Sequence, residues 1–326
     1  MSVPRVSIVV PSYNHARFAA KCAESVLAQT FGDWEMVVVD DGSTDDSLEV
    51  WRSFDDPRIQ VHSNERNVGT YATQNRGVAL SKADLFAILN SDDFWEPEKL
   101  ERQVRLLESD PEAAFCYTLG WTASEDGELR LDYDNHADCP IAERQELLPY
   151  LLEVNRVFAS SVLWRLEWAR FDESLRYSGD WIALLKASSE RHCACVPERL
   201  STWRIHGAST HQASDPVTLE EIRIRRAILR DPKRWFSPRF DARLVREKLS
   251  ICAMHLAALY VLWNSPREAR RAAWTAARLA LDKRAPLKRW AACFLPIGRV
   301  RRHMWFEVGE GQLPARLESV APLIWP

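Results

Sequence analysis

The stretch Asp84–Trp95 constrains the fold of this chain more than any other part of the sequence. An uninterrupted apolar run, Leu85–Leu89, ends in the polar residues Asn90-Ser-Asp-Asp93. The run has the length of a buried strand. In open α/β sheets the ligand crevice lies beyond the carboxyl ends of the strands, so Asp92 and Asp93 are expected at a ligand-binding edge.

Two adjacent carboxylates repel each other and resist burial, a conflict that a divalent cation would resolve. Hard cations such as Mg²⁺ take oxygen ligands and bridge carboxylates to substrate phosphates. The alternative is a helix-capping loop, because Glu96 and Pro97 follow and acidic residues suit the start of a helix. Pro97 already serves the cap, so the pattern favours a metal–phosphate site at Asp92 and Asp93.

Strands and helices alternate through the first third of the chain. The apolar patterns predict strands over Val6–Val10, Trp34–Val39, Arg58–His62, Asp84–Leu89 and Ala114–Thr118. Helices are predicted over Ala16–Gln29, from Asp46 to about Phe54, over Thr70–Leu80 and from Pro97 onward. This rhythm predicts an α/β fold with a mostly parallel sheet and right-handed crossovers.

The later part of the chain changes character twice. From Ala123 to about Gln145 the pattern dissolves, which indicates an excursion from the core. Order returns with a helix near 146–153, a strand-like segment over 158–164, a helix over 180–188 and an apolar segment over 200–205. After His211, helical periodicity over 220–229, 244–263 and 267–281 predicts a separate helical segment, and 326 residues suffice for two parts.

Charge and cysteine content exclude several classes of protein. The net charge of −3 gives no general attraction to nucleic acid. Seven cysteines without a CxxC pair argue against a disulfide framework or a zinc site. No apolar signal region and no apolar run of about 18–20 residues occurs, which predicts a cytoplasmic protein.

Residues 288–306 mix five Lys and Arg residues with aromatic residues. Such a composition suits peripheral contact with an anionic membrane, here the inner membrane face. A solvated basic face over packed aromatic side chains is the alternative.

Three further groups of residues carry chemistry. Tyr13 follows the first strand and can stack on a planar ring. Asp40 and Asp41 end the second strand, and a carboxylate there can accept hydrogen bonds from a nucleobase or from ribose hydroxyls. Asp180 follows a Ser-Gly turn, where it can be a helix cap or a general base. His206 is a candidate metal ligand.

Together these motifs resemble glycosyltransferase family 2. The resemblance rests on Val6–Asn14, Ser25–Thr30, Val38–Asp45, Asn67–Gly69 and Leu89–Asp93, and it covers residues 5 to about 211. It implies a GT-A fold, in which a Rossmann-like nucleotide-binding half (1–118) is fused to an acceptor half (119–211). The domain would thus span 1–211, followed by a helical C-terminal region over 212–326 that is available for a membrane or a partner.

The resemblance also implies a site for a nucleotide-sugar. The positions that correspond to nucleotide-binding residues are Pro11, Ser12, Tyr13, Asp41, Asn90 and Asp92. Pro11 and Tyr13 would line the base pocket and Asp41 would bind the base, most typically uracil. Asn90 departs from the family pattern, which often has Asp there, and it would bind ribose.

The metal and the catalytic base follow from the same resemblance. Asp92 and Asp93 would occupy the acidic metal motif, with His206 as a further ligand for Mn²⁺ or Mg²⁺. Asp180 would be the base, and Gly179 stands where the family usually has Glu.

The implied function is inverting transfer of a sugar, most typically from a UDP-sugar, to a hydroxyl of a saccharide or lipid-linked saccharide. Bacterial surface-polysaccharide assembly is the expected setting. A non-catalytic nucleotide-sugar binding module is one alternative. A nucleotidyltransferase is another, but it would carry a Gly-rich basic phosphate loop where this chain has Pro-Ser-Tyr-Asn-His.

Overall fold

The computed structural model describes residues 3–128, 130–133, 141–152, 155–168, 170–207, 214–235, 241–262 and 265–280. The chain forms two compact units, Met1–Gln212 and Ala213–Pro326, called here the N-terminal and the C-terminal unit. Their boundary lies one residue from the division expected from the sequence. The predicted basic aromatic segment at 288–306 lies outside the described residues.

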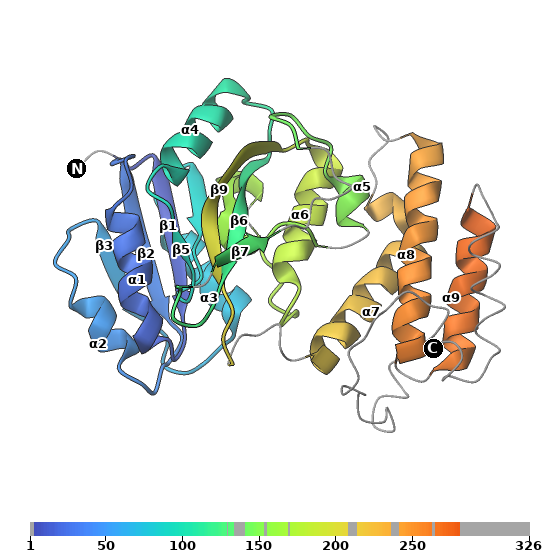
Figure 1. The fold of residues 1–326 in the computed structure, drawn as a ribbon, viewed down its shortest axis with the longest axis horizontal. Helices are drawn as coiled ribbons and strands as arrows, with labels where there is room; N and C mark the ends of the chain where they lie inside the picture. The colour runs from blue at the N-terminus through green and yellow to red at the C-terminus, as the bar shows by residue number, and fades with distance from the viewer. Residues whose placement is uncertain are drawn as a thin grey trace. The chain divides into compact units, whose positions relative to one another are not determined.

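The N-terminal unit is built on one sheet with the strand order β3-β2-β1-β4-β8-β6-β9-β5, and β7 pairs with β6 (Figure 1). The strands are β1 (Val6–Ser12), β2 (Trp34–Asp40), β3 (Ile59–Ser63), β4 (Leu85–Ile88), β5 (Phe94–Trp95), β6 (Phe115–Ala123), β7 (Arg130–Tyr133), β8 (Val162–Arg165) and β9 (Ala194–Arg204). Strands β1 to β4 pair in parallel, as do β6 and β9, while β8 runs antiparallel to both β4 and β6. The predicted α/β fold class is confirmed.

Helices cover both faces of this sheet. They are α1 (Ala16–Leu27), α2 (Ser47–Arg52), α3 (Thr70–Leu80), α4 (Lys99–Ser109), α5 (Leu148–Leu151) and α6 (Gly179–Glu190), with short 3₁₀ turns η1 (Ala159–Ser161) and η2 (Leu166–Trp168). The bounds of α3 are those predicted. Helix α4 begins two residues after Pro97, because Glu98 is its N-cap.

Alternation along β1 divides the core into two layers. Val6, Ile8 and Val10 are fully buried in one cluster with side chains of α1, α2 and α4. Val9 points to the other face, where its side chain lies so close to Gly77 of α3 that a Cβ there would be 2.3 Å from it. Both faces of β1 are therefore dry, which explains its unbroken apolar run.

Two parts of the sheet differ from the sequence prediction. The polar stretch expected to leave the core contains β7, whose residues pair with Gly120–Ala123 of β6. Strand β5 consists of Phe94 and Trp95 and pairs with β9. Both strands are short and are held by backbone pairing, β7 with the end of β6 that precedes it and β5 with the distant β9. Neither carries an apolar period of its own.

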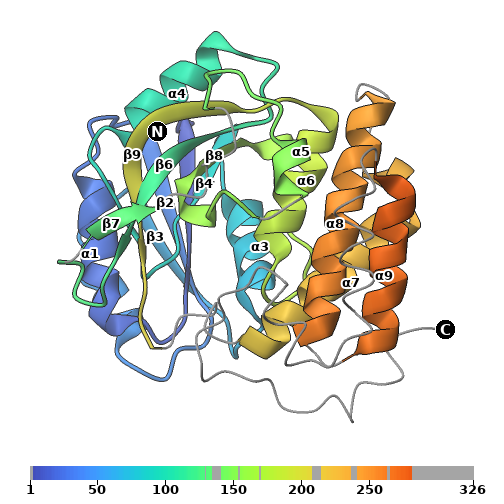
Figure 2. The ribbon, with the colours of Figure 1, turned by 45° about the vertical axis from the view of Figure 1, so that its right-hand side comes forward.

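The C-terminal unit contains three long helices that lie side by side (Figure 2). They are α7 (Ser214–Arg230), α8 (Ala242–Leu262) and α9 (Pro266–Leu279), close to the predicted ranges. Small side chains of α9, including Ala269 and Ala273, pack against Leu256, Ala257 and Tyr260 of α8. Among the described residues, no helix is both long enough and apolar enough to span a bilayer.

One ionisable side chain lies inside the core of the N-terminal unit. Lys99, the first residue of α4, is fully buried, and its Nζ donates to Gln103 Oε1 at 2.6 Å. Its ammonium also lies 3.9 Å from the ring centroid of Trp95. Burial lowers the pKa of Lys99 to about 7, because the charged form has lost its hydration.

We predict that Lys99→Met stabilises the protein at low pH and loses this advantage as the pH rises. Between pH 7 and about 10.4 the unfolded chain binds a proton at Lys99 that the folded chain has released, so stability of the native protein increases with pH there. Below pH 7 the full cost of the buried charge is present, on the order of 5 kcal/mol. Urea unfolding at pH 6, 8 and 10 measures the difference.

The exposed Lys186 of α6 provides the control, because Lys186→Met removes a solvated ammonium. Its effect on stability should not vary with pH. A pH-independent effect of Lys99→Met would contradict the buried charge.

Candidate active site

The polar residues predicted at the sheet edge come from three parallel neighbours. β1, β2 and β4 lie side by side in parallel, so their carboxyl ends share one edge of the sheet. Tyr13 follows β1, Asp41 follows β2 and Asn90 follows the apolar run of β4. The sequence prediction of a common edge is thus met by the strand order.

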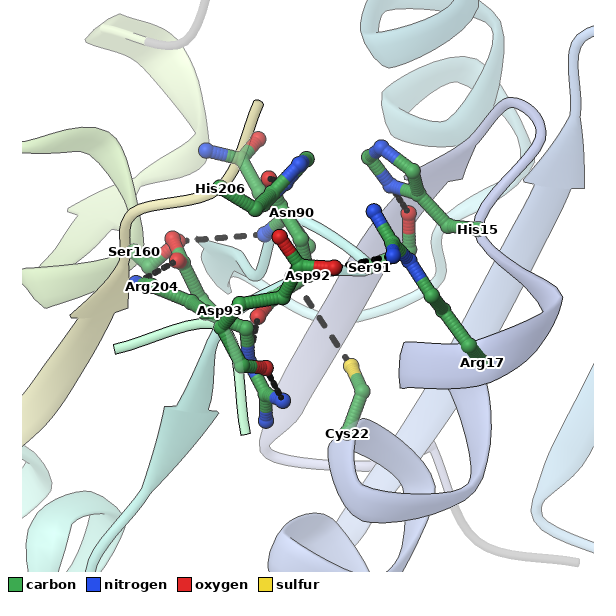
Figure 3. A network of polar contacts seen from close by, with 11 residues as sticks. His15, Arg17, Cys22, Asn90, Ser91, Asp92, Asp93, Ser160, Arg204 and His206 are labelled. Carbon is green, nitrogen blue, oxygen red and sulfur yellow. Dashed lines mark hydrogen bonds and ion pairs between the residues drawn. The ribbon is translucent and has the colours of Figure 1, made fainter. Parts of the chain in front are cut away.

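A group of three possible metal ligands lies at this edge. It consists of His15, Asp92 and His206, whose ligand atoms all lie within 4.8 Å of one another. Asp92 Oδ2 and His206 Nε2 are 3.0 Å apart, and His15 Nδ1 is 2.8 Å from Ser91 Oγ. Figure 3 shows the carboxylate of Asp92 between the two imidazole rings.

The surroundings of this group lower the pKa values of both Asp92 and His15. Burial alone would raise the pKa of Asp92, but the hydrogen bond with His206 and the charges of His15 and His206 outweigh it and lower that pKa. Burial lowers the pKa of His15, with Asp92 opposing the shift. A carboxylate and a neutral imidazole are the forms that bind metal ions.

Asp93 points away from this group and into the protein. Its Oδ2 accepts a hydrogen bond of 2.5 Å from Ser160 Oγ, and its Oδ1 accepts one of 3.0 Å from the backbone N–H of Arg204. Burial raises the pKa of Asp93 well above its ordinary value, and the charge of Asp92 adds to the shift. The two adjacent acids therefore sit in different environments, and the three-ligand group includes only Asp92.

Asn90 supports the inward acid. Its side chain hydrogen bonds to Asp93 and so opposes the rise in the pKa of that carboxyl. Its backbone N–H donates to Ser160 Oγ at 3.1 Å. An acid at position 90 would add a further negative charge beside Asp93, whereas the amide of Asn90 donates a hydrogen bond to it. This contact gives a physical reason for the departure from the family pattern.

Asp41 holds the segment between β3 and α3. Its carboxylate accepts three hydrogen bonds, from Asn64 Nδ2 at 2.7 Å and from the backbone N–H groups of Val68 and Gly69 at 2.9 Å each. A carboxylate offers about four acceptor sites. The three donors thus leave about one acceptor site of this buried carboxylate unused.

The other residues predicted to bind the nucleotide differ in accessibility. Tyr13 is 42% exposed and can present its ring to a ligand. Pro11 and Ser12 are buried in β1, and Ser12 Oγ accepts from Trp51 Nε1 at 2.9 Å. Ser12 thus contributes its backbone to the edge, while its side chain belongs to the core.

Asp180, the predicted base, lies in the first turn of α6. Tyr71 Oη donates to its Oδ1 at 3.3 Å, and Asn155 Nδ2 donates to its Oδ2 at 3.4 Å. Burial raises the pKa of Asp180, although hydrogen bonds from the backbone of Trp181 and from Tyr71 oppose the shift. A carboxylate of raised pKa is a stronger base.

Gly179 allows Tyr71 to approach this acid. A Cβ at Gly179 would lie 2.7 Å from two carbons of the Tyr71 ring. The ring is 6% exposed and stacks on Phe171 with centroids 6.0 Å apart, so it has little room to move. The absence of a side chain at position 179 is therefore a packing requirement of the Tyr71–Asp180 contact.

Helix α3 and residues 155–160 connect the acids that the sequence predicted in the site, which are Asp41, Asp92, Asp93 and Asp180. Helix α3 begins beside Asp41 and carries Tyr71, which contacts Asp180. Residues 155–160 join Asp180, through Asn155, to Asp93, through Ser160. Asn155 and Ser160 are five residues apart, and five extended residues span at most ~18 Å.

Sequence reasoning missed His15 and the contact of Ser160 with Asp93. His15 is the third residue after β1, and it meets Asp92 because β1 and β4 are neighbours in the sheet. The pairing of these strands, once inferred, would have marked His15 as a ligand candidate. Ser160 carries no such signal, because only the fold brings it to Asp93.

Comparison with known proteins gives a consistent result. The model of the family named "Glycosyl transferase family 2" matches residues 7–166. An uncharacterized glycosyltransferase of Nostoc sp. is 28% identical over 67% of this chain and 70% of its own length. Chondroitin synthase of Escherichia coli is 32% identical over 57% of this chain, which spans only 27% of that longer protein.

The solved structures agree on the fold. A crystal structure of S. aureus TarS 1–349 in complex with UDP-GlcNAc superposes with a TM-score of 0.65 at 15% identity, over 91% of this chain and 89% of that chain. The family model and the curated relatives identify the chain as a glycosyltransferase enzyme. The chain belongs to glycosyltransferase family 2.

We predict that Gly179→Ala destabilises the N-terminal unit by about 1–2 kcal/mol. Overpacking against Tyr71 costs about 1–3 kcal/mol, and the better helix propensity of Ala returns part of it. In the double variant Gly179→Ala/Tyr71→Leu the added methyl group should be tolerated. Chemical unfolding of the two single variants and the double variant measures the coupling.

Gly32→Ala is the matched control, since a Cβ at Gly32 meets no atom within 4 Å. Its effect on stability should be neutral or slightly favourable. Equal effects of the two Gly→Ala substitutions would refute the close contact at Gly179.

Proposed function

We propose that this protein transfers a sugar from a UDP-sugar to a hydroxyl of a saccharide or lipid-linked saccharide, with inversion at the anomeric carbon. The observation that carries the proposal is the group of His15, Asp92 and His206 at the carboxyl edge of a parallel sheet. Nucleotide-sugar binding by the structural neighbour and polysaccharide synthesis by the chondroitin synthase relative support the substrate class and a role in bacterial surface polysaccharide.

The three ligand atoms fit a divalent cation. They converge within 4.8 Å and combine two imidazole nitrogens with one carboxylate. Mg²⁺ favours oxygen ligands, whereas imidazole suits transition metals, so this set fits Mn²⁺ better than Mg²⁺. We therefore propose His15 as a ligand beside Asp92 and His206, with Asp93 positioning the turn that presents Asp92.

The donor would bind along the same edge. Tyr13 presents its exposed ring to the base, and Asp41 accepts one base N–H with its remaining lone pair. Asn90 lies beside the ligand group and binds ribose. When bound, the cation would neutralise the charge that develops on the departing diphosphate.

Asp180 would serve as the general base. The acceptor oxygen forms a bond to the anomeric carbon, the bond from that carbon to the diphosphate breaks, and the acceptor proton passes to Asp180. Tyr71 and Asn155 fix the orientation of the carboxylate. Its raised pKa increases its affinity for the transferred proton.

We predict that Asp180→Asn lowers sugar transfer by about 10²–10⁴-fold, the usual contribution of a general base. Donor binding should be unchanged, because Asp180 contacts neither the cation ligands nor Asp41 directly in the polar contacts described above. Transfer is measured with a panel of UDP-sugars and saccharide acceptors, and UDP affinity by calorimetry. Asp33 is exposed, so Asp33→Asn is the control. It should leave the rate of transfer and the UDP affinity unchanged.

Tyr71→Phe separates a base from a merely structural acid. It removes a hydrogen bond that favours the ionised carboxylate, so the pKa of Asp180 rises further. The acid limb of the pH–rate profile should move to higher pH, since the base must be ionised. Binding of UDP-sugars without transfer by the native protein would instead identify a binding module.

We predict that Asp92→Asn, His206→Gln and His15→Gln each weaken UDP binding in the presence of Mn²⁺. The reason is loss of one cation ligand, and the native protein should bind UDP more tightly with Mn²⁺ than with Mg²⁺. Calorimetric titration of UDP with each metal measures the effect.

The same titrations in EDTA provide the internal control, because metal-free UDP affinity should differ little among these variants. Asp33→Asn again tests for a general effect of charge. Unchanged Mn²⁺-dependent affinity in all three ligand variants would exclude the proposed cation site.

A further inference from the structure

The C-terminal unit contains a pocket of about 790 Å³ that the proposed function does not use. Helix α7 contributes Arg223, Arg226 and Arg230 to its lining, and α9 contributes Arg271. The three arginines of α7 are spaced by three and four residues, so they lie on one face of that helix. All of the lining residues belong to the C-terminal unit.

The rim of the pocket is strongly basic. Five of the lining residues are arginines and only two, Asp231 and Glu268, are acids. Arg230 and Arg234 are exposed, and within the described ranges no carboxylate forms an ion pair with either of them. The pocket therefore has an excess of three positive charges toward an incoming ligand.

The floor is apolar but carries two polar atoms without partners. Leu229 and Leu256 line it together with Trp235 and Tyr260, which are only 7% and 3% exposed. Trp235 Nε1 and Tyr260 Oη are buried and have no hydrogen-bond partner among the residues that the structure describes. An indole N–H can only donate, so what Trp235 lacks is an acceptor.

We propose that this pocket binds an organic phosphate with an apolar body. The phosphate oxygens accept hydrogen bonds from the arginine rim and from the buried donors of Trp235 and Tyr260, while the apolar body covers Leu229 and Leu256. Arginine rather than lysine at all five basic positions suits this role, because the guanidinium group binds phosphate in a bidentate manner.

The size of the pocket decides against a bare anion. A volume of about 790 Å³ falls within the range of about 300–1,000 Å³ that is typical of sites for whole organic ligands. Inorganic phosphate would satisfy the rim but leave the apolar floor in contact with water. The site is independent of the transferase proposal, because none of its residues takes part in the sheet-edge site.

Calorimetric titration of the full-length protein with dihexanoyl phosphatidic acid, kept below its micellar concentration, tests the proposal. The native protein should show saturable binding that is much tighter than its binding of inorganic phosphate. Arg230→Gln/Arg234→Gln should weaken this binding at least about tenfold, as expected for the loss of charge-assisted hydrogen bonds. Trp235→Phe and Tyr260→Phe should each weaken it severalfold.

The matched control is Arg243→Gln/Arg267→Gln, which removes the same charge from two exposed arginines of the same unit outside the pocket. It should change the affinity less than about twofold, since exposed charges act weakly at a distance in salt. Absence of saturable binding by the native protein, or equal weakening by both arginine pairs, would overturn the proposal.

Vesicles of phosphatidylcholine, with and without long-chain phosphatidic acid, identify the source of the ligand. A membrane lipid would be supported if vesicle binding requires phosphatidic acid and is reduced by Arg230→Gln/Arg234→Gln but not by Arg243→Gln/Arg267→Gln. Binding of the short-chain lipid alone, with no pocket-dependent vesicle binding, would support a soluble organic phosphate. These outcomes do not depend on sugar transfer, so failure of one proposal leaves the other testable.

Discussion

The buried carboxylate of Asp93 fixes the geometry on which the candidate site depends. It joins the loop after β4 to η1, through Ser160, and to the end of β9, through the backbone of Arg204. Arg204 Nε also donates to the backbone oxygen of Asp92 at 2.9 Å. Because these bonds hold the backbone of both acids, Asp92 has its side chain directed to His206, two residues beyond Arg204. The hydrogen bonds that Asp93 accepts offset part of the free-energy cost of burying its carboxylate. Removal of any of these donors would also change the position of the adjacent Asp92.

A second set of contacts places the proposed base relative to the nucleotide edge. Asp41 binds the backbone N–H groups just before α3, and α3 carries Tyr71 to Asp180. The base is therefore held by the same helix whose start is held by Asp41. This coupling depends on Gly179, because a side chain there would displace the Tyr71 ring. The Gly that replaces an acid of the family motif is thus part of the positioning of Asp180.

Much of this arrangement could be predicted from the sequence, because the apolar runs that form β1, β2 and β4 are unambiguous and their carboxyl ends must meet at one edge. The directions of individual side chains could not be predicted in this way. Asp92 and Asp93 were predicted as a pair of ligands, yet adjacent side chains face different surroundings, and the structure groups only Asp92 with the histidines. His15 and Ser160 enter the site through strand order and a turn 67 residues away from Asp93 in the chain, neither of which has a local signal.

The composition of the ligand group affects how the binding of the cation depends on the binding of the donor. Asp92 is its only carboxylate, since Asp93 is committed to Ser160 and Arg204 and position 90 is an amide. A divalent cation on one carboxylate and two neutral imidazoles would retain a net positive charge of one. That charge is poorly compensated in a partly buried site, and the diphosphate of a nucleotide-sugar would compensate it. A ligand group with one carboxylate and two histidines, beside an amide at position 90, therefore favours a site in which the cation and the donor stabilise each other's binding, so that neither is held tightly alone.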